Sequence, residues 1–302
     1  MGVFLGIDTS NYTTSLALVK DRQVLASYKM PVRVKENERG IRQSDALFYH
    51  TVNLPTLFEK MGEKEILAVG VSKSPRDVKG SYMPCFLAGV SVAKGISSVN
   101  GVDLYEFSHQ RGHIVAALYS CGRLDLLHNE FIAFHVSGGT TEILHVHNDE
   151  IDLIGGTLDL NAGQVIDRVG VMLGLSFPCG VALEKISADF SECDSRTFVR
   201  DLTCNLSGLE NIAQKMHQNG DDKSKIAGYV LKSVMRTIDK LSENVRSKYN
   251  DLPIIYAGGV MSNIKFREKL SKRADVYFAA AEYSCDNAAG IALLCEEKYL
   301  SE

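Results

Sequence analysis

The sequence predicts an α/β protein of two lobes with a duplicated core and a ligand cleft between the lobes. Each half of the chain opens with the same order of elements, a strand, a polar turn and a returning strand, at residues 4–19 and again at residues 130–146. Apolar strands then alternate with amphipathic helices, which is typical of α/β folds. The 302 residues, 45% of them hydrophobic, suffice for two lobes. We expect an N-terminal lobe of residues 1–125 plus 287–302 and a C-terminal lobe of residues 126–286.

In the first half, residues 4–8 form an apolar strand that ends in Asp8, residues 9–12 a turn, and residues 13–19 and 24–28 two further strands. Apolar residues at helical spacing predict a helix from Ser44 to about Lys60. Residues 66–71 read as a buried strand. Residues 85–97 read as a helix of small residues that permits close packing.

In the second half, residues 130–136 and 141–146 are strands around a turn at residues 137–140. Residues 226–248 carry an apolar stripe at helical spacing and predict a long amphipathic helix. Residues 253–257 form a strand that ends in Gly258-Gly259, and a helix starts at Ser262 or Asn263. A final helix is expected over residues 286–300.

Several features of the sequence predict a cytoplasmic protein that does not span a membrane. No signal peptide and no apolar run near ~18 residues is visible, and the seven cysteines are scattered without a C-x-x-C pair, which favours reduced thiols. Cys285 stands out because it adjoins Asp286. The net charge of -4 gives no global signature of nucleic-acid binding. A local patch of Arg33, Lys35, Arg39 and Arg42 could contact RNA, although a solvated loop is the plainer interpretation.

His109 and His113 form the most informative pair. In a helix, a spacing of four places both imidazoles on one face, one turn apart, where they can bind one metal ion. The pair alone is a weak signal of a metal site. Glycine-containing segments at residues 136–142, 162–167 and 256–263 strengthen the interpretation as an enzyme site. Asp286 offers a carboxylate near the C-terminus. Two histidines and one carboxylate suit iron or zinc equally well.

Three glycine turns predict an adenine-nucleotide site. Backbone N–H groups and hydroxyls of Ser137, Gly138, Gly139 and Thr140 could wrap a phosphate, although Gly-Gly equally predicts a tight hairpin. Gly258-Gly259 follows a strand and precedes a helix, which directs N–H groups toward a nucleotide, and Asn263 could add its amide.

Two further residues have a functional and a plain interpretation. Asp167, one turn after Gly163, could accept hydrogen bonds from ribose hydroxyls or could be an ordinary acid on a helix surface. Gly180 permits close approach of a ligand or simply forms a turn.

With these motifs, the chain resembles the TsaD-type tRNA N6-adenosine threonylcarbamoyltransferases, once labelled O-sialoglycoprotein endopeptidases. The resemblance runs nearly the whole length, through Leu5-Gly6-Ile7-Asp8-Thr9-Ser10, His109-x-x-x-His113, Val136-Ser137-Gly138-Gly139, residues 173–180, residues 206–209, Ala257-Gly258-Gly259-Val260-x-x-Asn263 and Cys285-Asp286-Asn287.

The resemblance implies an actin/hexokinase/chaperone-ATPase fold and a metal-dependent transferase. His109, His113 and Asp286 would be the metal ligands. Threonylcarbamoyl-adenylate would bind at Ser137, Gly138, Gly139, Asp167, Gly180 and Asn263. The threonylcarbamoyl group would pass to N6 of a tRNA adenosine beside the anticodon. The implied partners are tRNA and either proteins of the threonylcarbamoylation machinery or a second copy of the chain.

The chain departs from the family pattern at two places that bear on catalysis. Asn11-Tyr12-Thr13 stands where the family has a Cys and two acids, and Thr140 stands where it has a His. No catalytic residue is therefore assigned. The alternatives are a nucleotide- and metal-binding paralogue with another carbamoyl acceptor, and a non-catalytic partner of a true family member.

Overall fold

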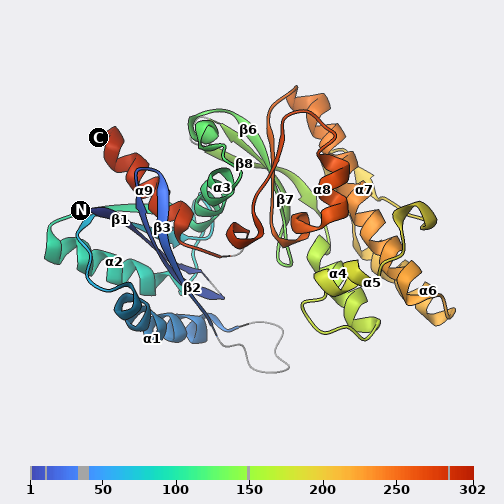
Figure 1. Cartoon of the computed structure of the whole chain (residues 1–302), viewed down its shortest axis with the longest axis horizontal. Coiled ribbons are helices and arrows are strands. Elements are labelled where there is room, and N and C mark those ends of the chain that lie inside the picture. Colours follow the sequence, from blue (N-terminus) through green and yellow to red (C-terminus); the bar gives the residue numbers. More distant parts are fainter. Residues whose placement is uncertain (1, 11, 33–40, 148–149, 285) are drawn as a thin grey trace. The chain divides into compact units, whose positions relative to one another are not determined.

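The computed structural model describes residues 2–10, 12–32, 41–147, 150–284 and 286–302. The chain forms two compact units, Met1–Leu127 with Glu282–Glu302, and His128–Ala281 (Figure 1). The expected borders were residues 125 and 286. The chain instead returns to the first unit after Ala281, so Asp286 is part of that unit.

A mixed sheet of five strands forms the centre of the first unit, in the order β3-β2-β1-β4-β5. Helices α1 and α2 pack on one face of this sheet, and α3 and α9 pack on the other. Both faces are covered, which is why β1 is buried along its whole length. The bounds are β1 Val3–Ser10, β2 Thr13–Lys20, β3 Gln23–Pro31, β4 Ile66–Ser74, β5 Asp103–Ser108, α1 Gln43–Met61, α2 Phe86–Asn100, α3 His109–Ser120 and α9 Ala289–Ser301.

The second unit has a seven-stranded sheet in the order β12-β11-β6-β7-β8-β10-β9. Its main core lies between this sheet and the helices α4, α6 and α7. The strands are β6 Phe131–Val136, β7 Thr141–His147, β8 Glu150–Thr157, β9 Val199–Arg200, β10 Thr203–Cys204, β11 Ile254–Ala257 and β12 Val276–Phe278. The helices are α4 Ala162–Met172, α5 Gly180–Ile186, α6 Ser207–Gln218, α7 Lys223–Tyr249 and α8 Ile264–Leu270, and short 3-10 turns lie at Leu124–His128, Phe190–Glu192, Gly259–Ser262 and Ala281–Tyr283.

The predicted duplication is confirmed by strand order and direction. In the first unit, β1 pairs antiparallel with β2 and parallel with β4, β2 pairs antiparallel with β3, and β5 runs parallel to β4. In the second unit β6, β7, β8, β11 and β12 repeat this arrangement in the places of β1, β2, β3, β4 and β5. The α/β architecture with two units therefore agrees with the sequence-based expectation.

Most predicted helices lie where they were expected, with one shifted start. Helices α1 and α7 extend the predicted ranges by a few residues, whereas α9 begins at Ala289 rather than at residue 286. Among the residues that the structure describes, no helix combines the length and apolar character needed to span a membrane. None of the six cysteines in the described part of the chain forms a disulfide, and five of them are buried.

Two glycines let α3 and α9 cross with their backbones in contact. A Cβ atom added to Gly290 would overlap the carbonyl oxygen of Gly112, and one added to Gly112 would lie 2.8 Å from Cδ1 of Ile291. Glycine is needed at such a crossing because it alone has no Cβ. The crossing fixes the start of α9 beside the first turns of α3.

We expect Gly290→Ala to lower the free energy of unfolding by about 1–3 kcal/mol, because the added methyl group must push two backbones apart. The control is Gly95→Ala, on an exposed face of α2 where a Cβ would have no neighbour within 4 Å. This control should be neutral or stabilising by roughly 0.5–1 kcal/mol. Denaturant unfolding of both variants measures the difference, and equal stabilities would show that the crossing is loose.

Candidate metal centre and ligand pocket

The start of α3 brings the two predicted histidines together. The Oγ atom of Ser108 accepts a hydrogen bond from the backbone N–H of Arg111 at 3.1 Å and caps the helix. His109 and His113 therefore lie on the first two turns, on one face, with ring centroids 4.3 Å apart. This is the arrangement that their spacing predicted.

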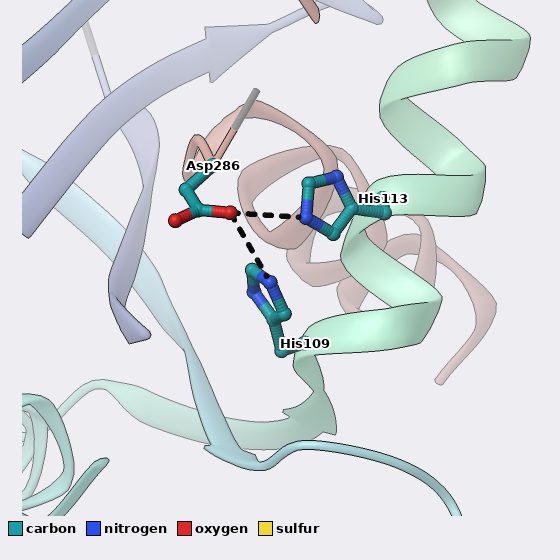
Figure 2. Close-up of side chains that lie close together, drawn as sticks. All are labelled: His109, His113 and Asp286. Atoms are coloured by element: carbon teal, nitrogen blue, oxygen red, sulfur yellow. Dashed lines mark ion pairs between the residues drawn. The ribbon is translucent and has the colours of Figure 1, made fainter. Parts of the chain in front are cut away.

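Asp286, just before α9, completes the group. Its Oδ1 atom lies 3.6 Å from Nε2 of His109 and 3.4 Å from Nε2 of His113 (Figure 2). One ligand atom from each of the three side chains lies within 4.8 Å of the others. Asp286 is far from the two histidines in sequence, but all three residues meet within the first unit. Cys285 and Asn11 lie outside the described residues, as do Arg33, Lys35 and Arg39 of the basic patch.

A fourth side chain, Asp8, was not recognised as part of this group from sequence. Its Oδ1 atom lies 3.2 Å from Nδ1 of His109, on the side of the ring away from Asp286. Asp8 is fully buried in β1 and accepts hydrogen bonds from the hydroxyls of Ser10, at 2.6 Å, and Ser72. A buried acid at the end of an apolar strand was the signal that could have identified it.

The charges of this group are strongly coupled. Burial alone would raise the pKa of Asp8, but His109 and the two serine hydroxyls together lower it. Burial alone would lower the pKa of His109, but Asp8 and Asp286 raise it to about 10. The pKa of Asp286 lies far below its usual range because hydrogen bonds and charges from both histidines outweigh burial. Two ionised carboxylates thus share a positive charge that lies between them.

The donors fit a single divalent metal ion. Separations of 3.4 and 3.6 Å between the Asp286 oxygen and the two imidazole nitrogens are compatible with donors about 2.0–2.2 Å from one shared ion. A metal-binding histidine usually donates its other N–H to a carboxylate, which fixes the ring, and Asp8 is placed to accept it. Three protein donors leave coordination positions for another ligand. Neither iron nor zinc is favoured by this donor set.

The second unit contains a pocket of about 390 Å³, in the size range of small-molecule sites. Five predicted ligand residues line it: Gly138, Asp167, Gly180, Gly259 and Asn263. The other lining residues are Gly163, Ile166, Phe177, Pro178, Val181, Glu184, Leu231, Val260 and Ser262. Its apolar wall was not predicted from the sequence, because those residues also read as ordinary core.

The remaining predicted pocket residues lie in turns beside the pocket. Ser137, Gly139 and Thr140 form the β6–β7 hairpin turn, where Oγ of Ser137 accepts the backbone N–H groups of Gly139, at 3.3 Å, and Thr140, at 3.1 Å. Gly258 has φ 98°, and a Cβ atom there would overlap the carbonyl oxygen of Val136. Packing between the ends of β6 and β11 therefore requires glycine at position 258, independently of any ligand.

Three pocket glycines are not explained by the packing of the fold, whereas Asp167 and Asn263 also have structural partners. Gly138, Gly180 and Gly259 have no positive φ, and a Cβ atom on any of them would have no neighbour within 4 Å. Asp167 accepts a hydrogen bond from the backbone N–H of Cys179 at 2.7 Å, and burial raises the pKa of its carboxyl group. Asn263 caps α8 by accepting the backbone N–H of Phe266 at 3.1 Å.

The fold places the chain in a class of two-unit α/β proteins, each unit built on one mixed sheet. Over 99% of this chain, the structure is similar to the ROK hexokinase from Thermus thermophilus, with a TM-score of 0.54, 12% identity and all of that chain covered. It is also similar to full-length HypF in its phosphate- and nucleotide-bound form, with a TM-score of 0.65 and 15% identity over all of this chain and 56% of that chain. At such low identity the likeness establishes the fold.

Sequence comparison identifies the family within this class. The model of TsaD, tRNA N6-adenosine threonylcarbamoyltransferase, matches residues 24–293, so the chain belongs to that family of transferases. The tRNA N6-adenosine threonylcarbamoyltransferase of Thermosipho africanus is 29% identical over 317 residues, which cover 96% of this chain and 92% of that protein. That of Carboxydothermus hydrogenoformans is 28% identical over 319 residues, covering 99% and 93%. The predicted family and enzyme class are confirmed.

We expect Asp8→Asn to weaken binding of Zn²⁺ or Fe²⁺ at the His109 site by 10–100-fold, the usual cost of losing a carboxylate behind a metal-binding histidine. The control is Asp125→Asn, a change at an exposed carboxylate of the same unit. Titration against a chromophoric chelator measures the affinity. If both variants bind metal as the unaltered chain does, Asp8 does not orient His109 for a metal.

We expect Gly259→Val to weaken binding of AMP, ADP or ATP by about tenfold or more, equal to about 1.4 kcal/mol. The new side chain would enter the pocket without disturbing the protein around it. Gly95→Val on α2, also without a neighbour within 4 Å, is the control for the substitution itself. Calorimetry that shows the same affinity in both variants would place the nucleotide elsewhere.

Proposed function

We propose that this chain transfers a threonylcarbamoyl group from threonylcarbamoyl-adenylate to N6 of a tRNA adenosine beside the anticodon. The convergence of His109, His113 and Asp286, in a chain that belongs to this family, carries the proposal. We place the protein in the cytoplasm, with tRNA as its partner and with either proteins of the threonylcarbamoylation machinery or a second copy of the chain.

The proposal assigns recognition of the adenylate to the pocket of the second unit. Gly138, Gly180 and Gly259 allow backbone groups to approach the ligand closely. Asp167 presents a carboxylate that can accept hydrogen bonds from ribose hydroxyls. Phe177 lines the same pocket and is 74% exposed, so its ring is available to pack on a flat base.

The proposal assigns a divalent metal, iron or zinc, to His109, His113 and Asp286. Such a metal supplies a Lewis acid that binds or polarises the oxygens of the threonylcarbamoyl group. With a metal bound, Asp8 would accept the Nδ1 proton of His109 in a hydrogen bond, which would leave the Nε2 lone pair for the ion. Ser10 and Ser72 hold Asp8 in place by donating to its carboxylate.

In the reaction, the N6 amine forms a bond to the carbamoyl carbon, and the bond from that carbon to the phosphate oxygen of the adenylate breaks. AMP leaves with the electron pair, and the amine loses one proton. The role of the protein is to hold both reactants and to stabilise charge that develops on the carbonyl oxygen.

A second candidate function is transfer to another acceptor, or support of a catalytic family member. It is favoured by Tyr12 and Thr13, which stand where the family has acids, and by Thr140, which stands where it has a histidine. In the structure Thr13 pairs with Ser10 at the turn between β1 and β2. It offers a hydroxyl in place of a carboxylate.

We expect Asp286→Asn to abolish transfer to tRNA, because the metal loses its charged ligand. Binding of AMP should persist, since its pocket lies in the second unit. The assay combines purified protein, the cell's partner proteins, threonylcarbamoyl-adenylate and unmodified tRNA, with Asp125→Asn as the control. Full activity of Asp286→Asn would exclude this metal-centred mechanism. No product from the unaltered chain would favour the second candidate function.

A further inference from the structure

A second group of histidines and carboxylates lies in the second unit, on one face of its sheet. His145 and His147 are two residues apart on β7, so both side chains project from the same face. Asp152 on β8 is directly opposite His145 in register. Glu130 immediately precedes β6, the strand on the other side of β7.

The side chains of this group contact one another in pairs. Nε2 of His145 lies 2.6 Å from Oε1 of Glu130, and Nε2 of His147 lies 2.9 Å from Oδ2 of Asp152. The two imidazole rings are 4.4 Å apart between centroids, with 30° between their planes. One ligand atom each from His145, His147 and Asp152 lies within 4.8 Å of the others. Two nitrogens and a carboxylate oxygen are thus close enough to reach one ion.

Burial makes the histidines fixed donors and leaves the carboxylates adjustable. The imidazoles are 13% and 23% exposed, and the ring of Tyr249 packs 4.8 Å from that of His145. The side chains of Glu130 and Asp152 are 52% and 58% exposed. Exposed carboxylates beside two largely buried imidazoles can turn toward an ion without displacing packed side chains.

The charges of the group also favour a shared cation. Two imidazoles whose ring centroids lie 4.4 Å apart would repel each other if both were protonated. One divalent ion avoids this repulsion, because it binds neutral imidazoles and neutralises both carboxylates. The alternative arrangement is two separate histidine–carboxylate ion pairs, which would need no metal.

We propose that His145, His147 and Asp152 form a second divalent metal site of the zinc type, with Glu130 beside the His145 imidazole. Three protein donors leave one position of a tetrahedral zinc ion for another ligand. The three protein ligands come from β7 and β8, so the ion would tie these two adjacent strands together. The site is at the opposite end of the β6–β7 hairpin from Gly138, and it does not depend on the proposed function.

The test is a zinc titration of the full chain with the first site removed. In a His109→Ala/His113→Ala background, Zn²⁺ should still bind with a stoichiometry of one. Adding His147→Ala should weaken that binding by at least about 100-fold, since loss of an outer partner of a ligand alone costs 10–100-fold. The matched control is His217→Ala in the same background, which changes an exposed histidine of α6 and should leave zinc affinity unchanged.

A second substitution distinguishes loss of a zinc ligand from a folding defect. Asp152→Asn replaces an exposed carboxylate and should weaken zinc binding while the circular dichroism and thermal unfolding of the zinc-free protein stay the same. Zinc should also raise the unfolding temperature of the background variant, and chelation should reverse the rise. Absence of a zinc equivalent in that background, or equal affinity with and without His147, would overturn the proposal and leave two ion pairs.

Discussion

The contact between the backbones of α3 and α9 is the constraint on which the first unit depends. At this crossing the carbonyl oxygen of Gly112 lies where a Cβ atom of Gly290 would be, and the Ile291 side chain packs against Gly112. Both helices cover one face of the sheet, and the segment before α9 is thereby held beside the first turn of α3. Asp286 reaches His109 and His113 because of this crossing. A larger residue at either glycine would alter both the core and the distances among the proposed ligands.

Asp8 links this helical layer to the sheet. Its carboxylate is held by Ser10 and Ser72, from β1 and β4, and it holds His109 at the start of α3. His109 thus contacts Asp8 on one side of its ring and Asp286 on the other, and these contacts join three segments that are distant in sequence. A buried carboxylate is costly unless it is paired. Asp8 and Asp286 therefore require either a protonated His109 or a metal ion bound beside His109. The proposed zinc site on β7 differs, because its carboxylates are exposed and its histidines are fixed by neighbouring strands.

Strongly periodic elements were predictable from the sequence, and elements that combine charge with burial were not. The stripe of α7 and the two opening hairpins are visible because local pattern and tertiary position agree. Strand β5 escaped prediction because Asp103 and Glu106 interrupt its apolar residues at the sheet edge. The His109–His113 pair followed from helical spacing and Asp286 was visible as a carboxylate near the C-terminus, while the family resemblance joined the three residues into one set of metal ligands. Asp8 was missed because its contact with His109 arises from tertiary packing, which no local pattern encodes.

The chain leaves the first unit after Leu127 and returns to it at Glu282, and this order has a consequence for biosynthesis. Helix α9 is buried against β1, β2 and β4, yet it is synthesised only after the whole second unit. The first unit therefore cannot complete its core while the second is being made, although the second is continuous from His128 to Ala281. A nascent chain will expose one apolar face of the first sheet until α9 has been synthesised, and exposed apolar surface of this kind is what chaperones bind.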